Sequence, residues 1–157
     1  MNKIFIRTIF LIMFITSSAC SYKPIFAEKI YNFEIIEIVY SGEKDVNKII
    51  NNKLGLIQKK DNASKKYSIL INTKKKKKVI SKDSQGDPLK FEYILIASYS
   101  IKENENTILS RDIEKEYIYN NDNDKFKLEQ NENIILENLS QDIGDMIISS
   151  IINLNDN

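Results

Sequence analysis

The chain has 157 residues, a formal net charge of +1, only four glycines, one cysteine and neither histidine nor tryptophan. Without histidine, a serine–histidine–aspartate triad, a cysteine–histidine pair and every histidine-ligated metal site are excluded. The small net charge gives no field that would recruit nucleic acid, and no glycine-rich phosphate loop is present. We therefore expect no cofactor, no metal, no nucleic-acid partner and no enzyme; a carboxylate pair is the alternative that remains for catalysis.

The first 19 residues have the anatomy of a secretory signal peptide, with Lys3 and Arg7, an apolar block at 9–15 and then small residues. The apolar block is too short to cross a bilayer as a helix, which needs about 20 apolar residues. Small residues directly before a single cysteine predict cleavage there and attachment of lipid to Cys20. The alternative is an ordinary cleaved signal peptide that leaves a free thiol. Two or three acyl chains would hold the protein on a membrane, since each buried CH₂ contributes about 0.8 kcal/mol.

The mature chain is expected to begin with a lipidated tether at 20–31, because this stretch has no clear period and contains Pro24. One domain at 32–157 follows. Residues 33–40 are rich in β-branched and aromatic side chains and predict its first strand.

Apolar residues next recur at steps of three and four, which predicts an amphipathic helix from about residue 43 to residue 60. Ser41 and Asp45 are the two candidates to cap its start. Alternation of apolar and polar residues then predicts a second strand at 66–73. The five lysines Lys74, Lys75, Lys76, Lys77 and Lys78 follow, and we expect them on a loop that continues into a turn at 81–88.

Two longer strands, at 89–102 and 107–120, predict a hairpin joined by a polar loop at 103–106. In the second of them Ser110, Asp112, Glu114 and Glu116 share one face, which we expect to see water. Tyrosines 93, 99, 117 and 119 are expected to pack in the core, with contact to a partner as the alternative.

A polar cap at 121–124 and a long apolar stripe predict a C-terminal helix over about 125–153. The element order is thus β-α-β-β-β-α. It predicts an α+β, two-layer sandwich in which two helices cover one face of a four-stranded mixed sheet and leave the other face bare.

The lysine run is the strongest local charge feature of the chain. Lysines at 74–78 are candidates to bind the phosphates of a lipid headgroup as point charges, and the alternative is a solvated charge run in a lysine-rich chain. Arg111 could assist such a site, but a mid-strand arginine is more often the cross-strand partner of a carboxylate.

Several short segments resemble the LptE family of lipopolysaccharide-assembly lipoproteins, once called rare lipoprotein B. The mature N-terminus reads CSYKPIF (20–26) and is similar to the start of that family. Lys66–Ile69 is similar to its tyrosine-led second strand, Lys90–Ile101 to its third strand, and Tyr117–Asn120 to the end of its fourth. The likeness covers essentially the whole mature chain.

This resemblance implies a lipid-anchored protein on the periplasmic side of the outer membrane. Its expected protein partner is an LptD-like outer-membrane β-barrel, which it would plug. The pair would deliver lipopolysaccharide to the outer leaflet, and the N-terminal lipid would bind the chain to the membrane. Ser21, in place of an aspartate after the cysteine, permits sorting to the outer membrane. The alternative is an accessory lipoprotein subunit of another periplasmic lipid or solute transport system.

Overall fold

The computed structural model describes residues 33–55, 57 and 63–155. Six elements follow one another along these residues. They are β1 (Phe33–Gly42), α2 (Lys44–Leu54), β2 (Lys65–Lys82), β3 (Pro88–Glu103), β4 (Asn106–Asn120) and α3 (Lys125–Asn155). Cys20, the predicted signal peptide and the predicted tether lie outside the described residues.

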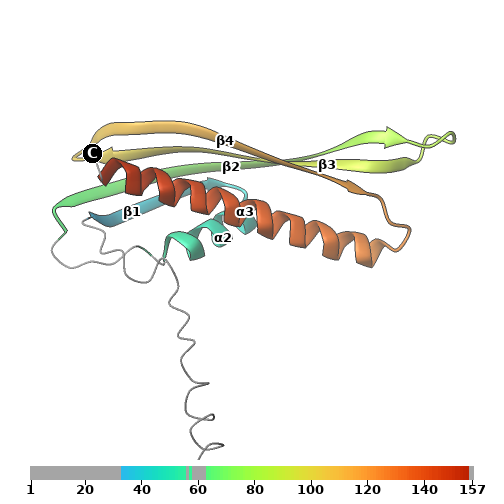
Figure 1. The fold of residues 1–157 in the computed structure, drawn as a ribbon, viewed down its shortest axis with the longest axis horizontal. Helices are drawn as coiled ribbons and strands as arrows, with labels where there is room; N and C mark the ends of the chain where they lie inside the picture. The colour runs from blue at the N-terminus through green and yellow to red at the C-terminus, as the bar shows by residue number, and fades with distance from the viewer. Residues whose placement is uncertain (1–32, 56, 58–62, 156–157) are drawn as a thin grey trace, which may run out of the picture. The chain divides into compact units, whose positions relative to one another are not determined.

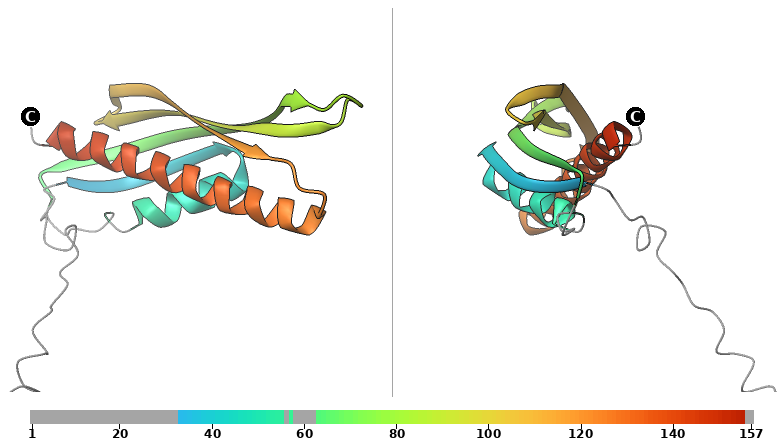
Figure 2. Two further views of the ribbon diagram at one scale, coloured as in Figure 1. Left: turned by 45° about the vertical axis from the view of Figure 1, so that its right-hand side comes forward. Right: turned by 90° about the vertical axis from the view of Figure 1, so that its left-hand side faces the viewer.

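The four strands form one mixed sheet in the order β1-β2-β3-β4. β1 pairs with β2 in parallel, whereas β2 with β3 and β3 with β4 pair antiparallel. Both helices lie on the same face of this sheet (Figure 1), and the view along the strands shows the two layers (Figure 2). The predicted two-layer α+β sandwich is therefore confirmed.

The core lies between the sheet and the helices, because apolar residues alternate along each strand and recur along each helix with the matching period. β3 contributes every second residue from Phe91 to Ile101, as predicted. The fully buried isoleucines of α3 are Ile143, Ile147 and Ile151. Among the four tyrosines considered above, those at 93, 99 and 119 are buried, but Tyr117 is 52% exposed.

Helix α2 is shorter than the sequence predicted, since it ends at Leu54 rather than near residue 60 and Gly55 occupies its C-cap. Its start also differs from the prediction, because neither Ser41 nor Asp45 is the N-cap. Glu43 is, and its side chain makes no capping hydrogen bond. The hydroxyl of Thr73 on β2 instead accepts a 3.0 Å hydrogen bond from the Glu43 backbone N–H. A strand thus caps this helix across the interface between the layers.

The hairpin and the C-terminal helix agree more closely with the sequence. β3 and β4 are joined by Asn104 and Glu105, both with positive φ (48° and 69°), as a tight two-residue hairpin turn requires. Asp124 caps α3 by accepting hydrogen bonds from the backbone N–H groups of Phe126 (3.0 Å) and Lys127 (3.3 Å). No helix in the described ranges is both long and apolar enough to cross a membrane.

Candidate functional site

The five lysines do not lie on a loop; all of them belong to β2, which continues to Lys82. Pairing with β3 runs through the whole stretch, with Lys74 opposite Ile96 and Lys78 opposite Glu92. Lysine is a poor strand former by itself. The long, apolar partner strand β3 supplies the backbone hydrogen bonds and the neighbouring side chains that keep the lysine stretch extended. The loop prediction was therefore wrong.

Because successive side chains of a strand point to opposite faces, the run divides into two sets. Lys75 and Lys77 point toward the helices. Lys75 forms ion pairs with Asp45 and Glu43 at the start of α2, and Lys77 forms one with Glu132 of α3. These two lysines therefore stabilise the contact between the sheet and the helices.

The pKa values record this coupling. Hydrogen bonding to Asp45 raises the pKa of Lys75. Partial burial by itself would raise the pKa of Asp45, but hydrogen bonds from Lys75 and from the Val46 N–H, together with the lysine charge, outweigh it and lower that pKa. Both changes favour the charged forms, so the pair persists over a wide pH range.

Lys77 belongs to a second cluster on the helix side. Its ammonium lies 4.2 Å from the ring centroid of Phe91, within the range of a cation–π contact. Glu132 accepts a second hydrogen bond from the Tyr119 hydroxyl at 2.7 Å. Burial, and then this hydrogen bond, raise the pKa of Tyr119. The phenol therefore stays neutral and links β4 to α3.

The other three lysines, Lys74, Lys76 and Lys78, point away from the helices and form what we call the lysine stripe. Lys78 makes an ion pair with Glu92 at 3.2 Å. Lys74 and Lys76 make no ion pair with any described residue. Two neighbouring, unneutralised ammonium groups on an uncovered sheet face are the part of the run with free binding capacity.

The face that carries the lysine stripe, here called the outer face, also carries the carboxylates that the sequence placed toward water. Asp112, Glu114 and Glu116 on β4, here called the acidic stripe, are all exposed. None of them makes an ion pair within the described part of the chain. Ile94 and Ile96 of β3 lie between the two stripes. The prediction of a water-facing side of β4 is confirmed.

Arg111 does not join the lysine stripe. It lies on the helix side of β4, beside Leu109, Ser150 and Leu154, and borders a small hollow of about 130 Å³. The expected ion pair between Arg111 and a carboxylate is absent among the described residues. Arg111 and the lysine stripe lie on opposite faces of the sheet and cannot contact one ligand together.

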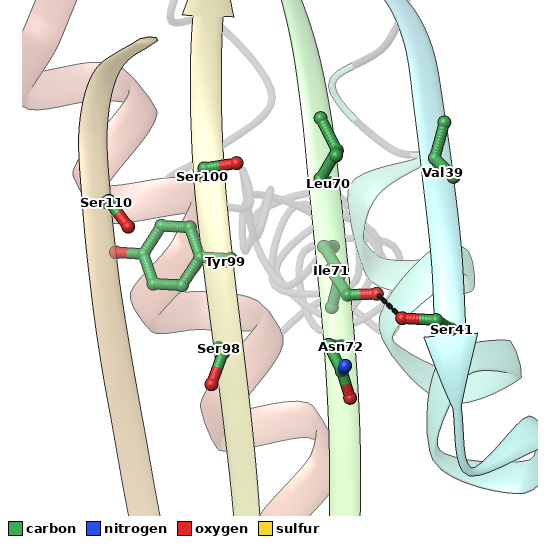
Figure 3. A pocket seen from close by; sticks show the side chains of 9 residues that line it. All are labelled: Val39, Ser41, Leu70, Ile71, Asn72, Ser98, Tyr99, Ser100 and Ser110. Carbon is green, nitrogen blue, oxygen red and sulfur yellow. Dashed lines mark hydrogen bonds between the residues drawn. The ribbon is translucent and has the colours of Figure 1, made fainter.

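A shallow groove of about 300 Å³ crosses all four strands on the outer face, from Val39 of β1 to Ser110 of β4 (Figure 3). Its lining combines apolar side chains, among them Val39 and Leu70, with small polar ones: Ser98 and Ser100 of β3, Ser110 of β4 and Asn72 of β2. Ser41 donates a 3.4 Å hydrogen bond to the Ile71 carbonyl at its rim. Sequence reasoning missed this groove, because serines spread over separate strands have no spacing that links them.

The described residues contain no group of three or more carboxylate, cysteine or histidine side chains close enough to hold a metal ion. The outer face offers charged groups, hydrogen-bonding groups and exposed apolar side chains over an open surface, which suits contact with a large partner better than enclosure of a small molecule.

No protein-family model matches the sequence, and a search of curated proteins gave no match either. Solved structures do share the fold. The crystal structure of rare lipoprotein B from Shewanella oneidensis superposes with a TM-score of 0.56 at 15% identity, covering 75% of this chain and 98% of that one.

Two further structures agree with it. An uncharacterized lipoprotein B from Nitrosomonas europaea gives a TM-score of 0.56 at 13% identity, covering 80% of this chain and 88% of that one. A minor lipoprotein from Acinetobacter baumannii gives 0.51 at 16% identity, covering 74% and 92%. At these identities the likeness concerns the fold, and the β-α-β-β-β-α domain of this chain has the fold of the rare lipoprotein B structures.

Proposed function

We propose that this chain is an outer-membrane lipoprotein of lipopolysaccharide assembly, anchored through lipid on Cys20. In this role it assembles with and plugs an LptD-like β-barrel. The observation that carries the proposal is the fold shared with rare lipoprotein B over most of both chains. The single cysteine behind a signal-like segment supports the anchor independently.

The properties of the domain suit a plug. The lumen of a large membrane barrel is polar, so a protein inside it needs a polar exterior and an apolar interior of its own. Here the buried apolar residues of α2, α3 and the sheet form one shared core. The outer face carries the lysine stripe, the acidic stripe and several serines, together with the exposed apolar side chains of Val39, Leu70, Ile108 and Ile118.

Within this role, the lysine stripe is our candidate contact with lipopolysaccharide. Lys74 and Lys76 have no ion-pair partner among the described residues and could contact phosphate groups, whereas Lys78 would have to share its charge with Glu92. Lys75 and Lys77, which the sequence grouped with them, are already neutralised by carboxylates on the helix side. Lysine ammonium groups would act as point charges, without the two-pronged geometry of arginine.

The first test is a pull-down of the tagged full chain from detergent-solubilised envelopes, followed by mass spectrometry. A stoichiometric LptD-like barrel is the expected result. Recovery of transporter subunits would favour the alternative, an accessory lipoprotein of another transport system. Recovery of neither would overturn the assignment of the partner.

The anchor is tested by Cys20→Ala. The variant should leave the membrane fraction on a carbonate wash, because it lacks the residue that carries the lipid. Retention of the variant in the washed membranes would contradict the lipoprotein assignment.

The lysine stripe is tested with Lys74→Gln/Lys76→Gln in a lipopolysaccharide-binding assay across a range of salt. Binding should weaken and its salt dependence flatten, because exposed charges are screened within about 10 Å at 0.1 M salt. The matched control is Lys44→Gln/Lys48→Gln, which removes the same charge from two exposed positions of α2. If both variants weaken binding equally, the lysine stripe has no specific role in binding lipopolysaccharide and is an ordinary solvated surface.

A further inference from the structure

Charged side chains on the outer face are arranged in an order across the strands that no ion pair between described residues uses. Pairing of the strands aligns Lys74, Ile96 and Glu114 in one row across the sheet, and Lys76, Ile94 and Glu116 in the next. The lysine and the glutamate of a row are two strands apart, about 10 Å between their backbones. No ion pair joins these four charged side chains to any described residue.

Both of these rows run from a positive end on β2, through an isoleucine on β3, to a negative end on β4. Such a row is complementary to its own reversed copy. A twofold axis parallel to the strands would lay β2 of one chain over β4 of another without changing the order of rows. Lys74 would then meet Glu114 of the second copy, and Lys76 would meet its Glu116.

The alternative axis, across the strands, would lay β2 over β2 and oppose lysine to lysine. Like charges in contact are strongly unfavourable, so the charge order selects one geometry. We propose that two copies of this chain associate face to face through their outer faces, related by a twofold axis along β3. The occupant of the bare sheet face is thus a second copy.

Packing is consistent with this arrangement near the axis. Ile96 is partly exposed and would contact its own counterpart, with the two sheets about 10 Å apart, whereas Ile94 is 5% exposed and is already covered by its neighbours. Aligned sheets cross at about −30°, so rows farther along the strands separate again. The contact is then three strands wide and only a few rows long, well below the ~800 Å² per partner of a standard interface. The dimer is therefore weak and sensitive to salt.

This inference goes beyond the proposed function and does not rest on it. The dimer would cover the lysine stripe, so self-association and binding of a phosphate-bearing lipid would exclude each other. Dissociation would precede any use of that face by another partner.

The test uses the purified full chain in nonionic detergent and sedimentation velocity at about 0.05 M and about 0.5 M salt. Two variants reverse one stripe each: Lys74→Glu/Lys76→Glu makes both stripes acidic, and Glu114→Lys/Glu116→Lys makes both basic. Wild type should dimerise at low salt and dissociate at high salt. Each variant alone should associate at least about tenfold more weakly. An equimolar mixture of the two variants should form a heterodimer, because an acidic face then meets a basic one.

The matched control is Lys44→Glu/Lys48→Glu, which makes the same charge change on α2 and should dimerise like wild type. Recovery in the mixture also shows that both stripe variants are folded. Wild type that stays monomeric at low salt would overturn the proposal. So would stripe variants that dimerise as wild type does, since another surface would then be responsible, and so would a mixture that fails to associate. Binding of lipopolysaccharide or a barrel enters none of these readouts.

Discussion

Thr73→Val is the substitution for which the structure predicts the most specific loss of stability. Thr73 is 1% exposed and lies on β2 against the start of α2. Its hydroxyl donates a 2.9 Å hydrogen bond to the side-chain oxygen of Asn47 and accepts one from the Glu43 N–H at 3.0 Å. Valine has nearly the same shape but neither donates nor accepts, so the substitution removes hydrogen bonds without opening a cavity.

The magnitude follows from the groups left behind. Asn47 is 8% exposed, and its side-chain oxygen would lose its donor, which costs about 1–3 kcal/mol for a buried acceptor. Loss of a helix cap costs about 1 kcal/mol, reduced here because the Glu43 N–H keeps a longer bond, 3.3 Å, to the Thr73 carbonyl. We expect a total of about 2–3 kcal/mol, or a fall of roughly 1–1.5 M in the urea midpoint.

Equilibrium urea unfolding followed by circular dichroism measures this loss. The control Thr73→Ser keeps the hydroxyl and removes one methyl group, so it should cost only about 1 kcal/mol. In a double-mutant cycle with Asn47→Ala, the two positions should couple by about 1 kcal/mol or more. A Thr73→Val loss below about 0.5 kcal/mol, or strict additivity in the cycle, would refute the cross-layer cap.

Three further substitutions test other parts of the fold. Gly42→Ala should be strongly destabilising in thermal unfolding, because Gly42 has φ +88° and a Cβ there would lie 1.9 Å from a backbone oxygen of β2; a melting temperature close to wild type would contradict that geometry. Ile147→Ala should lower the free energy of unfolding by about 2–5 kcal/mol, since Ile147 is fully buried. The control Ile134→Ala, at a 57% exposed position of the same helix, should change it by no more than about 0.5 kcal/mol. Equal losses in urea unfolding would mean that α3 packs by another face. Asp45→Asn should cost up to about 1 kcal/mol at neutral pH. Because the pKa of Asp45 is lowered, its stabilisation is present above the ordinary carboxyl pKa and is lost as the pH falls through the folded-state pKa. The stability difference between wild type and Asp45→Asn in urea unfolding should therefore close below about pH 4. A difference that stays constant with pH would exclude the ion pair with Lys75 as its source.

Much of the fold was predictable from local patterns. Alternation along β3 identified its buried face residue by residue, and the three- and four-residue steps identified α2 and α3. Those periods are set by the geometry of the strand and the helix, so they appear in the sequence wherever one side of an element is buried. The Asp124 cap of α3 was predictable for the same reason, since it contacts its own neighbours.

The cap of α2 was not predictable in this way. It comes from Thr73, 30 residues further along the chain, and no local signal connects the two. The extent of β2 was missed because lysine has low strand propensity and the turn residues near 81–88 suggested an earlier end. Pairing with β3 overrode that preference, as cross-strand contacts commonly do.

Some features of the candidate site could likewise be predicted from the sequence, and others could not. Sequence patterns alone were enough to show that five lysines are consecutive, that the carboxylates of β4 share one face, and that the order of elements is β-α-β-β-β-α. The tertiary structure was needed to show that Lys75 and Lys77 pair with carboxylates of the two helices, whereas Lys74 and Lys76 make no ion pair with any described residue. The register between β2, β3 and β4 also decided that each free lysine shares a row with a glutamate. The physical reason is that periodicity is a property of one strand, whereas charge pairing depends on which strands become neighbours.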